Sequence, residues 1–346
     1  MRILVTGGAG FIGSHVVDAY LEAGHEVWVL DDLSRGKRER VNHQARFVQM
    51  ELRSPDLREF LADGSFDCVN HHAAQMDVRV SVADPGRDAS INILGSLNLL
   101  EAIRTLGIPR VIFASTGGAI YGDQHHFPAN EEHPTAPQSP YGVAKLSVEH
   151  YLEYYRQIHG LRYAALRYAN VYGPRQDPHG EAGVVAIFCG RILDGNRLVI
   201  YGDGEQTRDY VCVKDVARAN LLALKYLTEI GETMESVEAL ESVGSKPSPC
   251  FRLGSSTTRQ FKNVFNIGTG IETSVNSLAA MLLDGAHVNV PIDHQPARPG
   301  EQARSCINPT RAREILGWEP TLPPADGLRA TLAWFKAQRA EPVAMT

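Results

Sequence analysis

The first half of the chain alternates short apolar runs with longer amphipathic segments. Residues 2–6 (RILVT) form a β-branched apolar run, which predicts a buried strand. Residues 11–24 carry apolar side chains at a spacing near 3.6, which predicts a helix that ends at Gly24. A second apolar run follows at 25–32. A strand, a helix and a strand in this order form a unit that implies a parallel sheet.

The same alternation continues to residue 172. We expect further strands at 45–50, 66–74, 110–116 and 161–173. We expect long helices at 89–107 and 141–160. The sequence therefore predicts a doubly wound parallel α/β sheet over residues 1–172.

Beyond residue 172 the pattern loosens. Helices are expected at 183–195, 213–227 and 325–338, and strands at 197–202 and 264–268. We interpret residues 173–346 as a smaller C-terminal α/β domain, with segments that cross back to the first domain. Residues 228–260 are rich in Ser, Glu and Gly with little periodicity, which predicts a flexible insertion on the surface.

A glycine-rich loop joins the first strand to the first helix. It contains Gly8-x-Gly10-x-x-Gly13 and also Gly7-x-x-Gly10-x-x-Gly13. In this position glycines allow a tight turn, a close approach of the backbone to a pyrophosphate, and close packing of helix and strand. A glycine-rich turn without a ligand is the alternative, which the strand–loop–helix context disfavours. We expect a Rossmann-type dinucleotide site here.

Two acidic residues, Asp31 and Asp32, end the second strand. A carboxylate there can accept hydrogen bonds from the adenosine ribose and would repel a 2′-phosphate, so NAD is favoured over NADP. Arg35, Lys37 and Arg38 follow, and basic residues could neutralise such a phosphate. We interpret these three residues as a solvated loop.

A tyrosine and a lysine, Tyr141 and Lys145, stand one helical turn apart after a proline. A phenol is a weak base at pH 7, but a nearby ammonium and a positive nicotinamide ring favour the phenolate. A catalytic hydroxyl is also needed to hold the substrate oxygen, and Ser115 and Thr116 supply it at the end of a predicted strand, where open α/β sheets place their ligands. These residue types predict a phenolate base that removes a hydroxyl proton while NAD takes a hydride from the same carbon. A helix start with an exposed lysine is the alternative, which the pair alone does not exclude.

The bulk composition narrows the possible classes of protein. The chain has 346 residues and is 43% hydrophobic. Its net charge of -6 at pH 7 does not favour binding to nucleic acid or to an acidic membrane surface. The five cysteines form no CxxC motif, and no 18-residue apolar stretch or signal-peptide layout is present. We therefore expect a cytoplasmic protein.

His71–His72 and His125–His126 are adjacent pairs whose members would point to opposite faces of a strand, so no metal is expected.

Several segments together resemble a known family. They are TGGAGFIGSH, DDLSRG, HHAAQ, STGGAIYG, YGVAK, LRYANVYGPRQ, GDGEQTRDYVCVKDVA and RPGE. They resemble the extended short-chain dehydrogenase/reductases, and within them the nucleotide-sugar 4-epimerases of the UDP-glucose 4-epimerase (UDP-galactose 4-epimerase) type. The resemblance covers nearly the whole chain except residues 228–260. It implies an isomerase of carbohydrate and galactose metabolism that uses NAD and acts on a UDP-sugar through a transient 4-keto sugar.

The resemblance also implies roles for individual residues. NAD would be held by Gly7, Gly10, Phe11, Ile12, Gly13, Asp31, Asp32, Leu33, Ser34, Gly36, Glu51, Leu52, Ala73, Ala74, Gln75, Asn92, Tyr141, Lys145 and Tyr168. The UDP-sugar would be held by Thr116, Tyr141, Asn170, Val184, Tyr201, Arg208, Arg298, Glu301 and Ser305. Glu51 departs slightly from the family, which more often has an aspartate at this position.

Three other functions share parts of this pattern. A nucleotide-sugar 4,6-dehydratase needs an extra acid and base, which the family supplies as Asp-Glu where this chain has Gly117-Gly118. A reductase exchanges its cofactor and usually prefers NADPH, and Asp31 argues against it. A non-catalytic NAD-binding protein is least favoured, because Tyr141 and Lys145 are both present.

The resemblance leads to three finer expectations. Asp177 stands where enzymes acting on uronic acids carry a basic residue, so a neutral hexose is favoured. Ser305 stands where family members place a residue beside the sugar 2-position, and a small residue there leaves room for an N-acetyl group. Helices over 90–106 and 141–158 have apolar residues on more than one face, and family members pair these helices in a homodimer.

Overall fold

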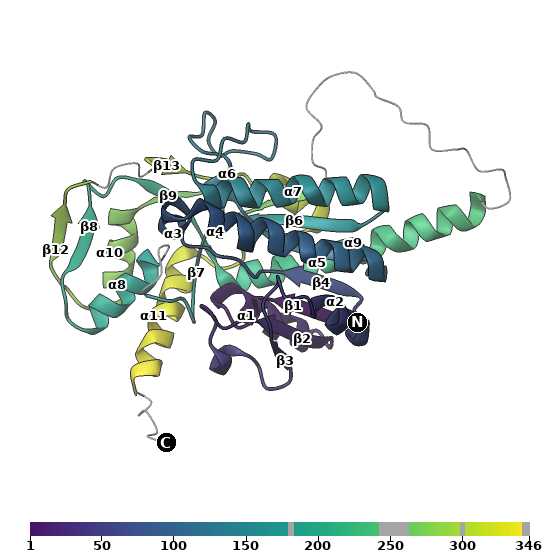
Figure 1. Cartoon of the computed structure of the whole chain (residues 1–346). Helices are drawn as coiled ribbons and strands as arrows, with labels where there is room; N and C mark the ends of the chain where they lie inside the picture. Colours follow the sequence, from purple (N-terminus) through teal and green to yellow (C-terminus); the bar gives the residue numbers. More distant parts are fainter. Residues whose placement is uncertain (179–182, 242–262, 298–301, 341–346) are drawn as a thin grey trace.

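A seven-stranded parallel sheet forms the larger part of the structure (Figure 1). The computed structural model describes residues 1–178, 183–241, 263–297 and 302–340. The strand order is β10-β6-β5-β4-β1-β2-β3, with every neighbouring pair parallel. Its strands are Arg2–Thr6 (β1), Glu26–Asp31 (β2), Arg46–Gln49 (β3), Cys68–His71 (β4), Arg110–Thr116 (β5), Arg162–Tyr168 (β6) and Val264–Ile267 (β10). The order reverses direction between β4 and β1, which confirms the doubly wound fold.

Helices cover both faces of this sheet, because its central strands are buried on both sides. α1 and α9 pack on one face, and α2, α5 and α7 pack on the other. These helices span Phe11–Glu22 (α1), Leu57–Gly64 (α2), Gly95–Leu106 (α5), Pro140–His159 (α7) and Val213–Glu241 (α9). Short helical segments link them at Arg38–Arg40 (η1), Val78–Ala83 (α3), Pro85–Ala89 (α4), Ser90–Leu94 (η2), Gly117–Ile120 (α6) and Ala312–Leu316 (η3).

The C-terminal part builds a second, smaller core beside the carboxyl ends of the large sheet's strands (Figure 1). β9 pairs with β7, β11 and β13, while β8 pairs with β12. These strands are Asn170–Tyr172 (β7), Leu198–Tyr201 (β8), Thr207–Cys212 (β9), Glu272–Ser274 (β11), Ile292–Gln295 (β12) and Arg304–Ser305 (β13). The helices around this core are Val184–Leu193 (α8), Val275–Ala286 (α10) and Pro324–Ala340 (α11).

Two segments of the C-terminal half return to the large sheet. β10 is wholly buried and pairs with β6 at the edge of that sheet. α9 packs against α1 and β6, with Val216, Ala219 and Leu224 in the core. These contacts tie β10 and α9 to the large sheet, while the division into two domains at residues 172 and 173, with segments crossing back, stays a prediction.

Three expected elements differ in detail from the structure. The strand expected at 161–173 breaks after Tyr168, so that β6 lies in the large sheet and β7 in the small one. The helix expected at 89–107 contains the π-helical turn η2 before α5. The helix expected at 213–227 continues to Glu241, so the first part of the predicted insertion is helical. Residues 242–260 of that insertion lie outside the described residues.

Among the described helices, none combines the length and the hydropathy that a membrane crossing requires.

Candidate active site

The site is built where the strand order reverses. The loops after β4 and β1 lie side by side at this point, because parallel strands present their carboxyl ends at one edge. Open α/β sheets bind ligands in the crevice that forms there. The glycine loop follows β1, the Asp31 loop follows β2, and residues 73–77 follow β4.

The glycine loop has the geometry that a dinucleotide requires. Gly7 has φ +71°, and a Cβ there would stand 2.6 Å from the Ala73 nitrogen, so this turn needs glycine. A Cβ at Gly13 would collide with the Gly7 carbonyl, which shows how closely α1 approaches the loop. Gly10 caps α1 without a side-chain hydrogen bond, so the first-turn N–H groups remain for a ligand. The tight loop and the free N–H groups at the start of α1 fit a bound pyrophosphate. Phe11 and Ile12 are the first two residues of this helix.

Asp31 holds its own loop in place. Its carboxylate accepts hydrogen bonds from the Ala9 nitrogen at 3.0 Å and the Leu33 nitrogen at 2.9 Å. Burial raises the pKa of Asp31, and these two N–H donors oppose that rise. A Cβ at Gly36 would stand 2.6 Å from Asp31 Oδ1, so Gly36 lets this loop close over the carboxylate. Asp31 keeps acceptor lone pairs for a ribose hydroxyl, because each carboxylate oxygen has two.

Asp32 has a more local role in the same loop. Its Oδ1 accepts hydrogen bonds from the Ser34 nitrogen at 2.8 Å and the Ser34 hydroxyl at 2.6 Å. Leu33 between them has φ 61°. The two acidic residues that the sequence treats together are thus separated, with Asp31 buried and Asp32 exposed.

An ion pair joins the loops after β2 and β4. Arg35 Nη2 lies 3.8 Å from Asp77 Oδ2. Since β1 lies between β2 and β4, this contact crosses the end of the strand that carries the glycine loop. Arg35 therefore has a partner, although the sequence suggests only a solvated loop. Farther along, Glu51 is exposed and paired with Arg53, while Leu52 is buried.

The loop after β4 is fixed by a buried polar cluster. Asn92 Oδ1 accepts a hydrogen bond from the Gln75 nitrogen at 2.8 Å, and Asn92 Nδ2 donates to the Gln75 carbonyl at 2.9 Å. Asp88 Oδ1 accepts from both amide side chains at 3.0 Å. This cluster sets the path of Ala73 and Ala74, which precede Gln75. Asn92 therefore acts on this loop through hydrogen bonds to its backbone.

Tyr141 and Lys145 lie together on α7. Ser139 caps this helix by accepting a hydrogen bond from the Gly142 nitrogen, and Pro140 begins it. Lys145 Nζ lies 5.9 Å from the centre of the Tyr141 ring and donates a 2.9 Å hydrogen bond to the Ala114 carbonyl of β5. The ammonium is buried against the Phe113 ring at 4.7 Å. The expected one-turn spacing thus brings the phenol and the ammonium to the end of β5.

Burial shifts the pKa of both groups away from their charged forms. Burial, with a smaller contribution from the Asp88 charge, raises the pKa of Tyr141 well above its ordinary value. Burial lowers the pKa of Lys145 to about 8, against the attraction of Asp88 and Glu149. In the protein alone the phenol therefore stays protonated at neutral pH, and a further positive charge is needed to favour the phenolate.

Thr116 and Asn170 lie close together beyond the end of β5. A Cβ at Gly118 would stand 3.7 Å from Asn170 Oδ1 and 4.0 Å from Thr116 Oγ1, so both side chains border this point. A Cβ at Gly142 would stand 2.7 Å from the Ala119 carbonyl. The start of α7 is therefore packed against α6, the segment that follows Thr116.

Ser115 contacts a different group from its neighbour. Its hydroxyl donates a 2.6 Å hydrogen bond to Glu149 Oε1, and both residues are buried. Glu149 in turn forms a buried ion pair with Arg167 of β6. The sequence groups Ser115 with Thr116 as catalytic, whereas the structure ties its hydroxyl to Glu149.

Tyr168 lies at the end of β6 inside another polar cluster. Its hydroxyl accepts a hydrogen bond from Asn220 Nδ2 at 2.9 Å and contacts His72 Nε2 at 3.2 Å. Burial raises the pKa of Tyr168 and lowers the pKa of His72 to about 3. The ring of Tyr168 stacks on the ring of His72, with 6.1 Å between their centres.

The residues expected to hold the UDP-sugar come from several elements of the C-terminal part. Val184 begins α8, Tyr201 ends β8, and Arg208 lies in β9. Ser305 is buried in β13 and pairs in register with Arg208. Arg298 and Glu301 lie outside the described residues.

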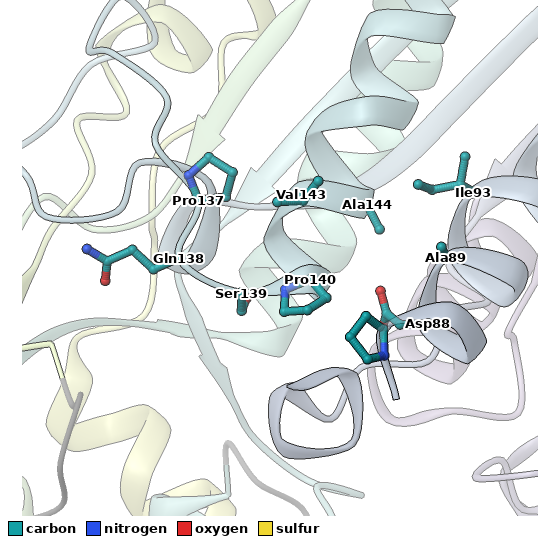
Figure 2. Close-up of a pocket in the computed structure, with 10 residues that line it drawn as sticks. Asp88, Ala89, Ile93, Pro137, Gln138, Ser139, Pro140, Val143 and Ala144 are labelled. Carbon is teal, nitrogen blue, oxygen red and sulfur yellow. The ribbon is translucent and has the colours of Figure 1, made fainter. Parts of the chain in front are cut away.

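A cavity of about 520 Å³ lies between α4, η2 and the start of α7 (Figure 2). Its lining is largely apolar and includes Ile93, Pro140, Val143 and, at one side, Asp88. None of the expected site residues that the structure describes lines this cavity. We therefore do not assign it to the cofactor or the substrate.

Sequence reasoning missed three buried charged groups near the site, Asp88, Glu149 and Arg167. Glu149 follows Lys145 by the spacing that separates Lys145 from Tyr141, so the same helical argument could have found it. No comparable signal marks Asp88 or Arg167. Within the described part of the chain, no group of three or more His, Cys, Asp or Glu side chains is arranged to hold a metal ion.

Comparison with known proteins shows which family the chain resembles in sequence and structure. The model of the NAD dependent epimerase/dehydratase family matches residues 3–235. A solved UDP-glucose 4-epimerase with UDP-glucose from Thermotoga maritima is 44% identical, and the match covers 98% of this chain and 100% of that chain with a TM-score of 0.85. A UDP-glucose 4-epimerase complex with NAD from Thermus thermophilus is 41% identical, with 97% and 99% covered and a TM-score of 0.83.

A third similar structure is a UDP-N-acetylglucosamine 4-epimerase from Methanobrevibacter ruminantium in complex with UDP-N-acetylmuramic acid. It is 34% identical, with 97% of this chain and 98% of that chain covered and a TM-score of 0.82. The family match spans well over half of the chain and includes the glycine loop, Tyr141 and Lys145. The chain therefore belongs to the NAD dependent epimerase/dehydratase family.

Proposed function

We propose that this protein catalyses the NAD-dependent 4-epimerisation of a UDP-hexose and interconverts UDP-glucose and UDP-galactose. The observation that carries the proposal is the pair of half-buried Tyr141 and buried Lys145 beside the end of β5, in the same domain as a loop that fits a dinucleotide. The similarity to a UDP-glucose 4-epimerase solved with UDP-glucose supports the choice of substrate.

Each residue of the site has a defined part in this reaction. Tyr141 removes the proton from the sugar 4-hydroxyl and later returns it, and Lys145 stabilises the phenolate. Thr116 and Asn170 orient the sugar beside them, and Arg208 meets the diphosphate. Bound NAD would supply the hydride acceptor for the same carbon, and the positive charge of its ring would also favour the phenolate of Tyr141.

Gly117 and Gly118 support epimerisation over 4,6-dehydration. A Cβ at Gly117 would stand 2.8 Å from Ile307 Cδ1, so a larger side chain there would require Ile307 to move. The extra acid and base of a dehydratase are therefore missing at these two positions, because glycine has no side chain to supply them. A reductase and a non-catalytic NAD-binding protein are the two competing functions, and an activity assay separates each of them from an epimerase.

Ser305 bears on the range of sugars that the enzyme accepts. Its small side chain is buried in β13, beside Arg208 in register. We propose that it borders the sugar 2-position and leaves room for an N-acetyl group, so that UDP-N-acetylglucosamine is also a substrate. Asp177 would repel a uronic acid, so neutral hexoses are preferred.

An apolar stripe on α7 supports a homodimer. Val143, Tyr151, Tyr154 and Ile158 recur on one face of this helix and are 39 to 55% exposed. Leu94 of the neighbouring η2 is 58% exposed. We propose that a second copy covers these side chains by pairing the same helices. We also propose a cytoplasmic location, since the described cysteines are free and buried.

The test of the proposed function is an assay of the purified protein with no added cofactor. The protein should carry bound NAD and interconvert UDP-glucose and UDP-galactose, and product formed in deuterated water should hold no deuterium at C4. A protein that carries NAD but leaves both sugars unchanged would sink the proposal. A requirement for added NADPH would favour the reductase instead.

A further inference from the structure

The end of β5 is held by side chains one helical turn apart on α7. Lys145 Nζ binds the Ala114 carbonyl at 2.9 Å, and Glu149 Oε1 accepts the Ser115 hydroxyl at 2.6 Å. Tyr141, Lys145 and Glu149 are spaced by four residues, so they lie along one face of the helix. Two consecutive residues of β5 are therefore attached to the face that carries the proposed base.

Glu149 is itself held rigidly. Arg167 Nε donates to its Oε1 at 3.0 Å and Arg167 Nη2 donates to its Oε2 at 2.6 Å. Both side chains of this pair are at most 1% exposed. Arg167 Nη1 also donates to the Tyr121 hydroxyl at 2.9 Å, and that hydroxyl donates to Asn266 Oδ1 at 2.7 Å. A buried ion pair needs partners of this kind, because removing either charge leaves the other unpaired in the interior.

Strand geometry separates Ser115 from Thr116. Successive side chains of a strand point to opposite faces. Phe113 packs with Val148 and Leu152 of α7, so Ser115, two residues later, also faces α7. The Ser115 hydroxyl is therefore directed away from the face of its neighbour, and its contact with Glu149 fixes the backbone from which Thr116 extends.

We propose that Glu149, held by Arg167 and bonded to Ser115, is a positioning residue that sets the end of β5, and with it Thr116, relative to Tyr141. This inference rests on the proposed epimerase function for the step that it serves. In this inference Ser115 helps to position the end of β5 and does not contact the substrate. Tyr141, Lys145 and Thr116 are the groups that contact the reacting sugar and the cofactor.

The charge of Glu149 adds a second effect on Lys145. The charged and titratable groups that face Lys145 are Asp88 from α4, Glu149 and Tyr141 from α7, His71 from β4, and His72 directly after β4. Burial lowers the pKa of Lys145 to about 8, and the carboxylates of Asp88 and Glu149 oppose that fall. A neutral residue at position 149 therefore lets the pKa fall further, so that Lys145 loses its proton at a lower pH.

The first variant is Ser115→Ala, which removes the contact and leaves the ion pair intact. We expect kcat for UDP-glucose to fall about tenfold with KM changed less than twofold, because displacement of a reacting group slows the chemical step. The matched control is Thr331→Val, which removes another wholly buried hydroxyl, one that donates to the Gly327 carbonyl in α11. Equal kcat in the two variants would overturn the inference.

The second variant is Glu149→Gln, which keeps the shape and removes the charge. We expect the alkaline limb of the kcat profile to move to lower pH by at least about half a unit, since less Lys145 remains protonated. If kcat of Glu149→Gln is lower but the alkaline limb of its pH profile stays where it is in the parent, this part of the inference is contradicted. If Glu149→Gln does not fold, because Arg167 is left unpaired, Ser115→Ala decides alone.

A third measurement does not depend on epimerase activity. Amide hydrogen exchange in the NAD-bound protein should be faster over residues 115–120 in Ser115→Ala than in the parent or in Thr331→Val. If the parent protein has no activity on UDP-sugars but Ser115→Ala still exchanges faster, the proposed function is rejected and the positioning role of Glu149 is retained. If the parent is active but Ser115→Ala exchanges at the parent's rate, the positioning role is rejected and the proposed function is retained.

Discussion

At the residue scale, the chemistry depends on a phenol that the protein alone keeps protonated. Burial raises the pKa of Tyr141 well above its ordinary value, and the Lys145 ammonium lies 5.9 Å from the centre of its ring. The site is therefore prepared to become basic only when a second positive charge is present. In the proposed reaction, the positive ring of bound NAD would supply this second charge.

Replacing Tyr141 with Phe should remove the proposed base and leave the cofactor site intact. We expect the rate of epimerisation to fall by at least ~10², the usual contribution of general-base catalysis. The bound NAD should persist, and its absorbance can be measured in the same sample. Near-normal activity of the variant with its NAD in place would show that another group acts as the base.

His15 should make the protein less stable in mild acid. Burial lowers its pKa from 6.5 to about 4, and its ring contacts the Pro174 carbonyl at 2.9 Å. The unfolded chain binds a proton between these two values while the folded chain does not, so stability is full above pH 6.5 and falls as the pH drops towards 4. The loss should be about 1–3 kcal/mol. Denaturant unfolding of His15→Gln should show a weaker pH dependence in this window, and an identical slope would contradict the assignment.

The size of residue 305 should decide which sugars fit. The variant Ser305→Tyr should lose activity on UDP-N-acetylglucosamine while its activity on UDP-glucose persists, because the larger ring fills the space proposed for the N-acetyl group. Steady-state rates with the two sugars measure this ratio directly. Equal loss of both activities, or no N-acetyl activity in the parent, would show that Ser305 does not border the 2-position.

At the scale of elements, loops at the carboxyl ends of the strands carry most of the proposed cofactor contacts. The Asp31 loop is closed by its own carboxylate, and the loop after β4 is closed by Asp88 and Asn92. The Arg35–Asp77 pair then joins these two loops across the glycine loop. An epimerase has no need to release NAD in each cycle, and such a contact would slow its escape.

Replacing Arg35 with Ala should therefore speed the dissociation of NAD. The side chain of Arg35 is 63% exposed, so the effect should be modest, about two- to fivefold. It should shrink at high salt, where exposed charges are screened. Arg38→Ala is the control, since Arg38 lies in the same segment but packs over the Phe47 ring at 4.6 Å. Equal dissociation rates in all three proteins would show that the pair does not retain the cofactor.

At the scale of the whole molecule, the two parts of the chain are joined by more than a linker. β10 and α9 return to the large sheet, and β7 leaves it for the smaller one directly after β6. Asp209 of β9 accepts hydrogen bonds from Thr269 and Gly270, which follow β10. β9, which carries Arg208 of the proposed substrate site, is thus joined to the loop after β10, a strand of the large sheet.

The exposed stripe on α7 should form a subunit interface. Light scattering at micromolar concentration should show a dimer for the parent protein, since contiguous exposed apolar side chains favour association. Tyr154→Glu combined with Ile158→Glu should yield a monomer, because burial of two carboxylates in the interface is costly. Ile315→Glu is the control, as Ile315 is equally apolar and 46% exposed but lies on η3. A monomeric parent would refute the proposed dimer.

The sequence by itself determined the features that depend on local pattern. The large sheet follows from apolar runs, and the glycine loop follows from residues that are adjacent in the chain. The Tyr141–Lys145 pair follows from helical spacing, which α7 realises. Each of these depends on the backbone geometry of one segment, so a few neighbouring residues are enough to predict it.

The tertiary structure alone decided which buried polar groups meet. The Ser115 hydroxyl donates a hydrogen bond to Glu149, which lies 34 residues away along the chain, and the Asn70 side chain donates one to Asn220, which lies 150 residues away. It also decided that the strand after α7 divides between two sheets at Ala169. Such contacts are set by how helices and strands from distant parts of the chain pack, because a buried polar group must find its partner wherever the fold brings one within reach. No periodicity within a single segment records that choice.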